Sequence, residues 1–260
     1  VEGGVGGAGG RGHLLHALQV TGLGENTIIV FASDHGEMLG ERGLWYKMSF
    51  FEWSARIPLI ISAPNQFTPR RVRQNVSLVD LLPTLVAIAT HDAPQSFAAP
   101  LDGHSLLPLL HGEAGQAADT ALGELLGEGA IAPLVMIRNG RFKYIYSPPD
   151  PEQLYDLVAD PHELNNLASA PSHAQIRADF YAKMQAQWDI ETLHAQVLAS
   201  QKRRHLVHKA LSNGRHTPWD FQPHQDASQK YMRNHLDLNV LERTSRFPSP
   251  ELPEHNSSKK

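Results

Sequence analysis

The stretch of sequence that decides the fold is Thr27-Ile28-Ile29-Val30-Phe31-Ala32-Ser33, which is followed at once by Asp34-His35-Gly36. A continuous β-branched run of this kind is typical of a strand that is buried on both faces. A second such run is Ile57-Pro58-Leu59-Ile60-Ile61-Ser62, and residues 13–22 and 77–90 carry apolar residues at helical spacing. This alternation of helix and buried strand predicts an α/β layer with a parallel or mixed sheet.

The helix expected at 77–90 has a clear start signal and a clear apolar face. Ser77 is a good N-cap, and Asp80 stands three residues later, as in a capping box. The face that we expect to pack into the core consists of Leu78, Leu81, Leu82, Leu85 and Ile88.

After about residue 130 the pattern changes to short strands and then to helices. Asn139-Gly140 separates residues 134–138 from residues 141–146, which is the strongest short signal for a β-hairpin. Residues 153–157 then predict a third strand of a small antiparallel sheet. Helices are expected from about residue 172 and over 191–211, and the sequence after residue 215 has no period.

These patterns divide the chain into four parts. We expect a flexible glycine-rich segment at 1–12, an α/β domain at 13–130, a small subdomain of hairpin and helix at 131–200, and an extended polar tail at 201–260. A tail without a hydrophobic period becomes ordered only by lying on another surface.

The composition excludes several classes of function. A net charge of -4 and a pI near 6.4 give no reason to expect nucleic acid or an anionic membrane as a partner. No apolar run is long enough to span a bilayer and the first residues lack a secretory pattern, which together predict a cytoplasmic protein. The chain has no cysteine, so disulfides, thiolate metal sites and a cysteine nucleophile are all excluded.

Asp34 and His35 are the first candidates for chemistry. They close a predicted buried strand, and ligands of open α/β sheets bind at the carboxyl ends of strands. The pair supplies one hard oxygen ligand and one imidazole ligand, and Gly36 lets the backbone turn sharply beside them. The alternative is an aspartate that caps the following helix, next to a surface histidine.

The context of this pair resembles the sulfatase branch of the alkaline phosphatase superfamily. The similar residues run from Ser33-Asp34-His35-Gly36-Glu37-Met38-Leu39-Gly40 to Glu41-Arg42-Gly43-Leu44-Trp45-Tyr46-Lys47, and Arg56-Ile57-Pro58-Leu59 follows. The resemblance implies part of the alkaline-phosphatase-like mixed sheet, flanked by helices. It implies that Asp34 and His35 bind a divalent metal, with Ca²⁺ first and Mg²⁺ or Mn²⁺ as alternatives. It also implies that Lys47 contacts the sulfate and serves catalysis, because an ammonium aimed at sulfate oxygens stabilises charge in the transition state.

Two further segments resemble sulfatases, and we expect both to be structural. Asp102-Gly103-His104-Ser105-Leu106-Leu107-Pro108 would end a loop and begin a short helix. Leu154-Tyr155-Asp156-Leu157, with Asp160-Pro161, Glu163 and Asn166-Leu167-Ala168 after it, would close a strand and turn.

The tail resembles the C-terminal extension of bacterial choline sulfatases, through residues 201–214, 218–223 and 231–235. This implies choline-O-sulfate as the substrate and a homo-oligomer formed through the extension. It also implies that Glu124 lies near the choline head group, since a quaternary ammonium is recognised by carboxylates and aromatic faces. The alternative for Glu124 is a solvent-facing helix residue beside Glu128. Trp45 and Tyr46 would either line a cation site or pack against the loop.

Sulfatases use a formylglycine nucleophile made from cysteine, and this chain has none. The resemblance covers residues 13–248 and the later half of the family fold, so we expect a truncation or a misassigned gene start. The chain alone is expected to show no turnover. The other functions that the residues leave open are a phosphonate monoester or aryl-sulfate hydrolase of the same superfamily, and a non-catalytic oligomerisation or binding module.

Overall fold

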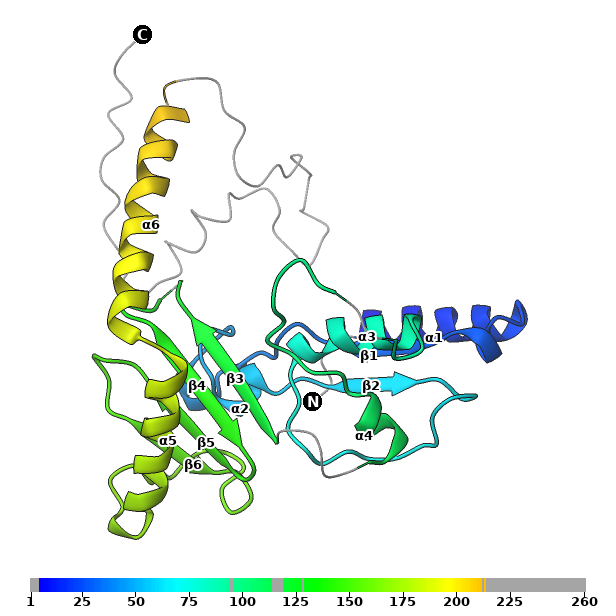
Figure 1. Ribbon diagram of the computed structural model, residues 1–260, viewed down its shortest axis with the longest axis horizontal. Helices are drawn as coiled ribbons and strands as arrows, with labels where there is room; N and C mark the ends of the chain where they lie inside the picture. The colour runs from blue at the N-terminus through cyan, green and yellow to red at the C-terminus, as the bar shows by residue number, and fades with distance from the viewer. Residues whose placement is uncertain (1–4, 94–95, 114–118, 128, 212, 214–260) are drawn as a thin grey trace. The chain divides into compact units, whose positions relative to one another are not determined.

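The structure, a computed structural model, describes residues 5–93, 96–113, 119–127, 129–211 and 213 (Figure 1). The chain divides into two compact units, Val1–Ala199 and Ser200–Lys260. The helices are α1 (Val5–Val20), α2 (Glu52–Ala55), α3 (Leu81–Ala89), α4 (Leu107–His111), α5 (Ala174–Gln187) and α6 (Ile190–Leu211). The strands are β1 (Ile29–Ala32), β2 (Leu59–Ser62), β3 (Thr120–Leu125), β4 (Leu134–Asn139), β5 (Phe142–Tyr146) and β6 (Gln153–Asp156).

Helix α1 begins earlier than the sequence predicts. It starts at Val5, so residues 5–12, which the glycine content predicts to be flexible, are helical. Glycine costs about 1 kcal/mol relative to alanine in a helix, which is why the pattern favours coil there. Extending a helix is easier than starting one, and the turns around Leu14 and Leu18 supply the nucleus from which α1 continues backward.

Strands β1 and β2 form where they were predicted, but their environment differs from the prediction. They pair antiparallel, with Ile29 opposite Ser62 and Ala32 opposite Leu59. Neither strand is buried on both faces: β1 is half-buried along its length, and Ile60 of β2 is exposed. Among the described residues no third strand joins this pair, so one edge of each strand has no ladder partner there.

The inner face of α3 is also not the one that the leucine spacing predicts. The capping contact is confirmed, because the Asp80 carboxylate accepts a hydrogen bond from the Ser77 amide at 2.8 Å. However, Leu82 and Leu85 are exposed, whereas Thr84 and Ala87 are buried. The physical reason is a tertiary hydrogen bond, since the Thr84 hydroxyl accepts from the Leu106 amide at 2.8 Å and draws this side of α3 toward α4.

The four-stranded antiparallel sheet has the order β3-β4-β5-β6. The predicted hairpin between β4 and β5 is confirmed, with Asn139 opposite Phe142, so that Gly140 and Arg141 form the two-residue turn. Gly140 has a φ of +55°, which glycine adopts without a steric penalty. Strand β3 was not predicted, and it pairs with β4 along its whole length. The sheet therefore crosses the domain boundary expected at residue 130.

This sheet is covered on both faces. Val135, Ile137 and Tyr144 point to one face and pack with Phe180 and Met184 of α5. Helix α5 lies along this sheet (Figure 1). The opposite face carries Met136, Ile145 and Tyr155, which pack against Phe50 and Phe51. The loop before α2 thus lies against one face of the sheet, and that loop also contains Lys47.

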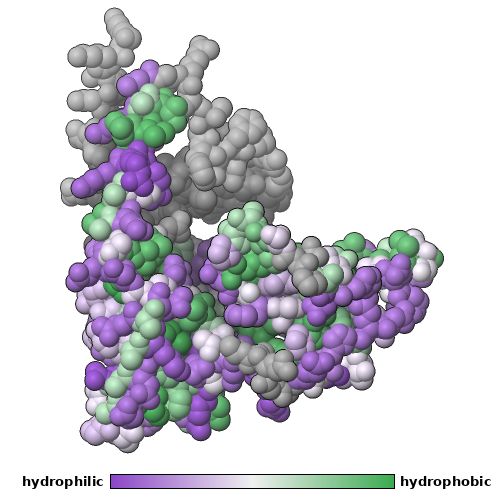
Figure 2. Space-filling view, viewed as in Figure 1, coloured by the Kyte–Doolittle hydropathy of each residue, from purple (hydrophilic) through white to green (hydrophobic). Residues whose placement is uncertain are grey.

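Helix α6 covers the predicted residues 191–211 and starts at Ile190. Patches of hydrophobic surface interrupt its hydrophilic exterior (Figure 2), and they include the exposed side chains of Leu198, Leu206, Val207 and Leu211. The rest of the predicted extension, residues 214–260, lies outside the described residues. No helix of the described chain is long and apolar enough to cross a membrane.

Candidate functional site

The carboxyl end of β1 turns sharply through Ser33 and Gly36. The Ser33 hydroxyl donates to the His35 carbonyl at 2.7 Å, and the His35 amide donates to Asp34 Oδ1 at 2.9 Å. No helix follows Gly36 directly, and the next α-helix is α2, so Asp34 does not cap a helix as the alternative proposed. These local hydrogen bonds hold the Asp34 carboxylate and the His35 ring side by side.

The site brings His35 and Lys47 together. The His35 Nδ1–H donates to the Gly36 carbonyl oxygen at 2.7 Å, and the Lys47 Nζ lies 2.7 Å from His35 Nε2. A carbonyl oxygen only accepts and an ammonium only donates, so this arrangement fits the tautomer with its proton on Nδ1. The lone pair of Nε2 therefore faces Lys47, which donates to it.

Gly36 is required by a close approach of two backbone segments. Its amide donates to the Ser54 carbonyl at 2.7 Å, and the next amide, that of Glu37, donates to the Trp53 carbonyl at 2.9 Å. A Cβ on Gly36 would lie 1.9 Å from the Trp53 carbonyl oxygen, closer than any real contact. The absence of a side chain at Gly36 thus lets the strand end contact α2.

The loop between Gly36 and Lys47 stores backbone strain. Leu39, Arg42 and Tyr46 all have positive φ, which costs roughly 1–2 kcal/mol for a residue with a Cβ. Hydrogen bonds hold the loop in this form: the Tyr46 amide donates to Glu37 Oε1 at 2.6 Å, and the Met38 amide donates to the Tyr46 carbonyl at 2.8 Å. Such strain is found at functional sites, where the surrounding structure enforces it.

The donors at this site fit part of a metal coordination sphere. Asp34 Oδ2 and His35 Nε2 are 3.4 Å apart, a separation that suits two neighbouring ligands of one cation. The Asp34 carboxylate is 82% exposed, and the hydrogen bond from the His35 amide holds its pKa below the usual value. Among the described residues, no group of three or more His, Cys, Asp or Glu side chains could hold a metal. Asp34 and His35 together offer two donor atoms, whereas Ca²⁺ typically takes six or more ligands.

Trp45 and Tyr46 are exposed, next to Lys47. Their exposed fractions are 65% and 63%, so neither ring is buried. The Trp45 ring lies over Gly40 of the same loop, where a Cβ would be 3.6 Å from it. Two aromatic rings that precede Lys47 in the sequence are therefore largely open to solvent.

Glu124 is exposed, as the alternative of a solvent-facing residue expected, but it lies on strand β3 and not on a helix. Its Oε1 accepts a hydrogen bond from the indole nitrogen of Trp188 at 2.5 Å. Within the described part of the chain, no hydrogen bond or ion pair joins Glu124 to Asp34, His35 or Lys47. Its carboxylate is oriented by Trp188, whose ring is buried between the sheet and α5.

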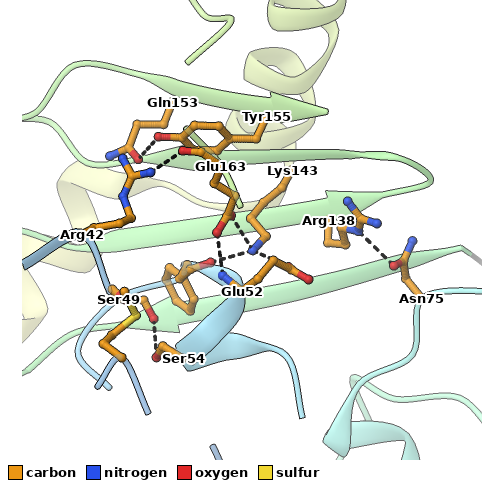
Figure 3. A network of polar contacts seen from close by, with 12 residues as sticks. Arg42, Ser49, Glu52, Ser54, Asn75, Arg138, Lys143, Gln153, Tyr155 and Glu163 are labelled. Atoms are coloured by element: carbon orange, nitrogen blue, oxygen red, sulfur yellow. Dashed lines mark hydrogen bonds and ion pairs between the residues drawn. The ribbon is translucent and has the colours of Figure 1, made fainter. Parts of the chain in front are cut away.

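The sequence patterns missed a buried ionic network centred on Lys143 (Figure 3). Lys143 of β5 is 1% exposed and pairs with Glu163, also 1% exposed, at 2.9 Å and with Glu52 of α2 at 2.5 Å. The signal available in the sequence is a lysine inside the run Phe142-Lys143-Tyr144-Ile145, where the strand alternation places it on a buried face. A buried lysine needs carboxylate partners, but strand patterns do not say where these partners come from.

Two family models match the chain. The model described as N-sulphoglucosamine sulphohydrolase, C-terminal, matches residues 40–189, and the model described as choline sulfatase enzyme C terminal matches residues 195–247. Choline-sulfatase of Rhizobium meliloti (strain 1021) is 45% identical over 243 residues, which make up 92% of this chain and 47% of that protein. Arylsulfatase K of Gallus gallus is 41% identical over 167 residues, 60% of this chain and 30% of that protein.

Solved structures of the same fold are also similar. Phosphonate monoester hydrolase of Agrobacterium radiobacter matches with a TM-score of 0.56 and 32% identity, over 72% of this chain and 38% of that one. This likeness confirms the expected α/β architecture. The chain spans less than half the length of each of these three proteins.

Proposed function

This chain belongs to the sulfatase family, and on that premise we propose that it forms the C-terminal part of a sulfuric ester hydrolase that cleaves choline-O-sulfate into choline and sulfate. The observation that carries the proposal is the cluster of Asp34, His35 and Lys47 at the carboxyl end of β1. Support for choline comes from the choline-sulfatase relative and from the family match at residues 195–247.

We assign Lys47 to the sulfate. Its ammonium is held beside the His35 imidazole and attracts the exposed Asp34 carboxylate, so one positive charge stands among the groups at the end of β1. An ammonium aimed at sulfate oxygens stabilises the charge that develops as the ester bond breaks, and removing one such donor typically costs about 10²–10³-fold in rate. Lys47 donates to His35 Nε2, the atom that would hold a metal, so its ammonium would be available to the sulfate if a cation occupied that lone pair.

Asp34 and His35 are the proposed metal ligands, with Ca²⁺ first and Mg²⁺ or Mn²⁺ as alternatives. The hydrogen bond from the His35 amide lowers the pKa of the Asp34 carboxyl, and the Gly36 carbonyl fixes the tautomer that leaves His35 Nε2 able to coordinate. A divalent cation, when bound, supplies Lewis-acid stabilisation of the sulfate oxygens. These 260 residues include no cysteine, so they do not themselves supply a formylglycine nucleophile.

Glu124 is the proposed contact for the choline head. Trp188 orients its carboxylate by a hydrogen bond to one oxygen, Oε1. A carboxylate held against an aromatic ring suits a quaternary ammonium, which offers charge but no hydrogen-bond donor. A homo-oligomer through residues 201–260 remains part of this proposal.

The test is a chimera in which residues 13–260 replace the matching half of the Rhizobium choline-sulfatase. We expect hydrolysis of choline-O-sulfate, and we expect Asp34→Ala and Lys47→Met to lower kcat by about 10²-fold or more. Lys183→Met, which removes a surface lysine of α5 that contacts Asn139, is the matched control and should keep full activity. An active chimera that tolerates both site variants would contradict the site assignment.

The same chimera separates the alternatives. The phosphonate monoester hydrolase and arylsulfatase K relatives favour a second candidate, a hydrolase of phosphonate monoesters or aryl sulfates. A substrate panel with these esters and choline-O-sulfate, compared by kcat/KM, decides between them. A folded chimera that cleaves none of the three would favour a non-catalytic module, and turnover by the isolated 260-residue chain would refute our expectation that it is inactive.

A further inference from the structure

We propose that Lys143 and Glu163 are positioning residues for Lys47: they hold the loop that aligns Lys47 with His35, although they lie on the C-terminal sheet and the turn after it. The catalytic meaning of this inference rests on the proposed function. The inference itself concerns how the geometry of the Asp34, His35 and Lys47 cluster is maintained.

Lys143 holds the backbone just before α2. Its Nζ donates to the Phe50 carbonyl at 2.8 Å, to Glu163 Oε1 at 2.9 Å and pairs with Glu52 Oε1 at 2.5 Å (Figure 3). These three contacts use all three protons of the ammonium. The Lys143 side chain is 1% exposed and all three of its N–H groups have partners, so it is held in one position. Because Lys143 belongs to β5, it ties the backbone at Phe50 to that strand.

Glu163 holds the start of the same helix. Its Oε2 accepts the amide of Glu52 at 2.7 Å, which is one of the helix N-terminal N–H groups that have no partner within the helix. The carbonyl of Glu163 in turn accepts a hydrogen bond from Arg42, whose guanidinium lies 4.2 Å from the centre of the Phe51 ring. Glu163 has a φ of +56°, so its own backbone is held in a strained form.

The contacts continue from α2 to the cluster without a gap. The buried Ser54 hydroxyl donates to the Lys47 carbonyl at 2.6 Å, and the Ser54 carbonyl accepts the Gly36 amide at 2.7 Å. Gly36 carries the carbonyl that fixes the His35 ring. Both halves of the His35–Lys47 contact thus attach to the turn of helix that Lys143 and Glu163 hold, so we infer that this contact depends on them.

Fold stability alone does not account for this buried ionic network. Replacing a complete buried ion pair by apolar side chains is often neutral for stability, whereas removing one partner leaves an uncompensated charge. Two methionines in place of Lys143 and Glu163 would fill the space but make no hydrogen bond to Phe50 or Glu52. Glu52 is partly exposed and can turn to water, so its charge is not left buried.

The experiment compares Lys143→Met, Lys143→Met/Glu163→Met, and the control Lys183→Met in the 260-residue chain. The side-chain ¹⁵N resonances of His35 report its tautomer and its contact with Lys47, and Lys47→Met provides the signature of a broken contact. Amide hydrogen exchange of Gly36 reports the hydrogen bond to Ser54. Thermal unfolding reports stability separately, so positioning and folding are read independently.

We expect Lys143→Met to lower the Tm by about 10 °C and the double variant to recover most of that loss. In both variants the side-chain ¹⁵N resonances of His35 should match those of Lys47→Met, and the Gly36 amide should exchange at least tenfold faster than in the parent chain. Lys183→Met should change neither measurement. If Lys143→Met does not fold, the double variant alone decides. A folded single or double variant that keeps the native His35 signature overturns the proposal. Neither readout depends on sulfate hydrolysis, so a failure of the proposed function would leave this test unaffected.

Discussion

Replacing Gly36 by alanine should disrupt the site more than any other single methyl group that could be added to it. The added Cβ would lie 1.9 Å from the Trp53 carbonyl oxygen, 2.9 Å from its carbon and 3.1 Å from the Ser54 carbonyl oxygen. All three atoms belong to the backbone, so no side-chain rotation relieves the overlap. The two segments must separate by roughly 1.5 Å to reach ordinary van der Waals contact.

The cost follows from what this separation breaks. The hydrogen bonds of the Gly36 and Glu37 amides to Ser54 and Trp53, at 2.7 and 2.9 Å, would stretch beyond hydrogen-bonding distance. Each contributes about 0.5–1.5 kcal/mol, and overpacking adds about 1–3 kcal/mol. We therefore expect Gly36→Ala to lower the free energy of unfolding by roughly 4 kcal/mol, and to move His35 away from Lys47.

The assay is urea denaturation followed by circular dichroism, together with the His35 ¹⁵N signature. Gly127→Ala is the matched control, because a Cβ on Gly127 meets nothing within 4 Å. That variant should stay within about 0.5 kcal/mol of the parent chain. A Gly36→Ala chain that is as stable as Gly127→Ala, with the His35 signature intact, would refute the argument from close approach.

Two further predictions concern the C-terminal sheet. Leu154 is fully buried under α5, so Leu154→Ala should lower the free energy of unfolding, measured by urea denaturation, by about 2–5 kcal/mol. Leu122 is exposed on β3, so Leu122→Ala should lower it much less. Equal losses in the two variants would contradict the packing described. The Arg141 guanidinium lowers the pKa of Asp156 by donating two hydrogen bonds to its carboxylate. Asp156 therefore binds a proton more readily in the unfolded chain than in the folded one. The free energy of stabilisation that this pair contributes is fully present at pH values above 3.8, the ordinary pKa of aspartate. It is lost as the pH falls through the lowered pKa of Asp156. Arg141→Gln should flatten the stability profile in this acid range, and Arg177→Gln, at a surface pair 3.5 Å from Glu152, should not.

Several parts of the fold were predictable from local sequence. The hairpin at Asn139-Gly140, the helix that became α6, and the capping contact of Ser77 with Asp80 all depend on residues within a few positions of one another. The grouping of Asp34, His35 and Lys47 belongs to this class as well, because one short loop joins them. Short loops close at a small entropic cost, so their sequence alone restricts their form.

Other features depended on contacts that the sequence does not display. Strand β3 is one, since Thr120–Leu125 carries Gly123 and Glu124 and lacks the alternation of a half-buried strand. It forms because β4 offers a complete ladder to pair with. The inward side of α3 is another, since the Thr84 hydroxyl outweighs the leucine spacing once Leu106 donates to it.

By itself, then, the sequence determined most of the elements, though neither β3 nor the start of α1, and it determined the loop that joins Asp34 to Lys47, since these follow from periodicity and short-range steric rules. Only the tertiary structure decided which residues hold that loop in place. Lys143 and Glu163 stand 93 and 111 residues from their partners Phe50 and Glu52, and sheet register brings them together. A buried charge must find an opposite charge wherever the fold supplies one, and no spacing in the chain encodes that distance.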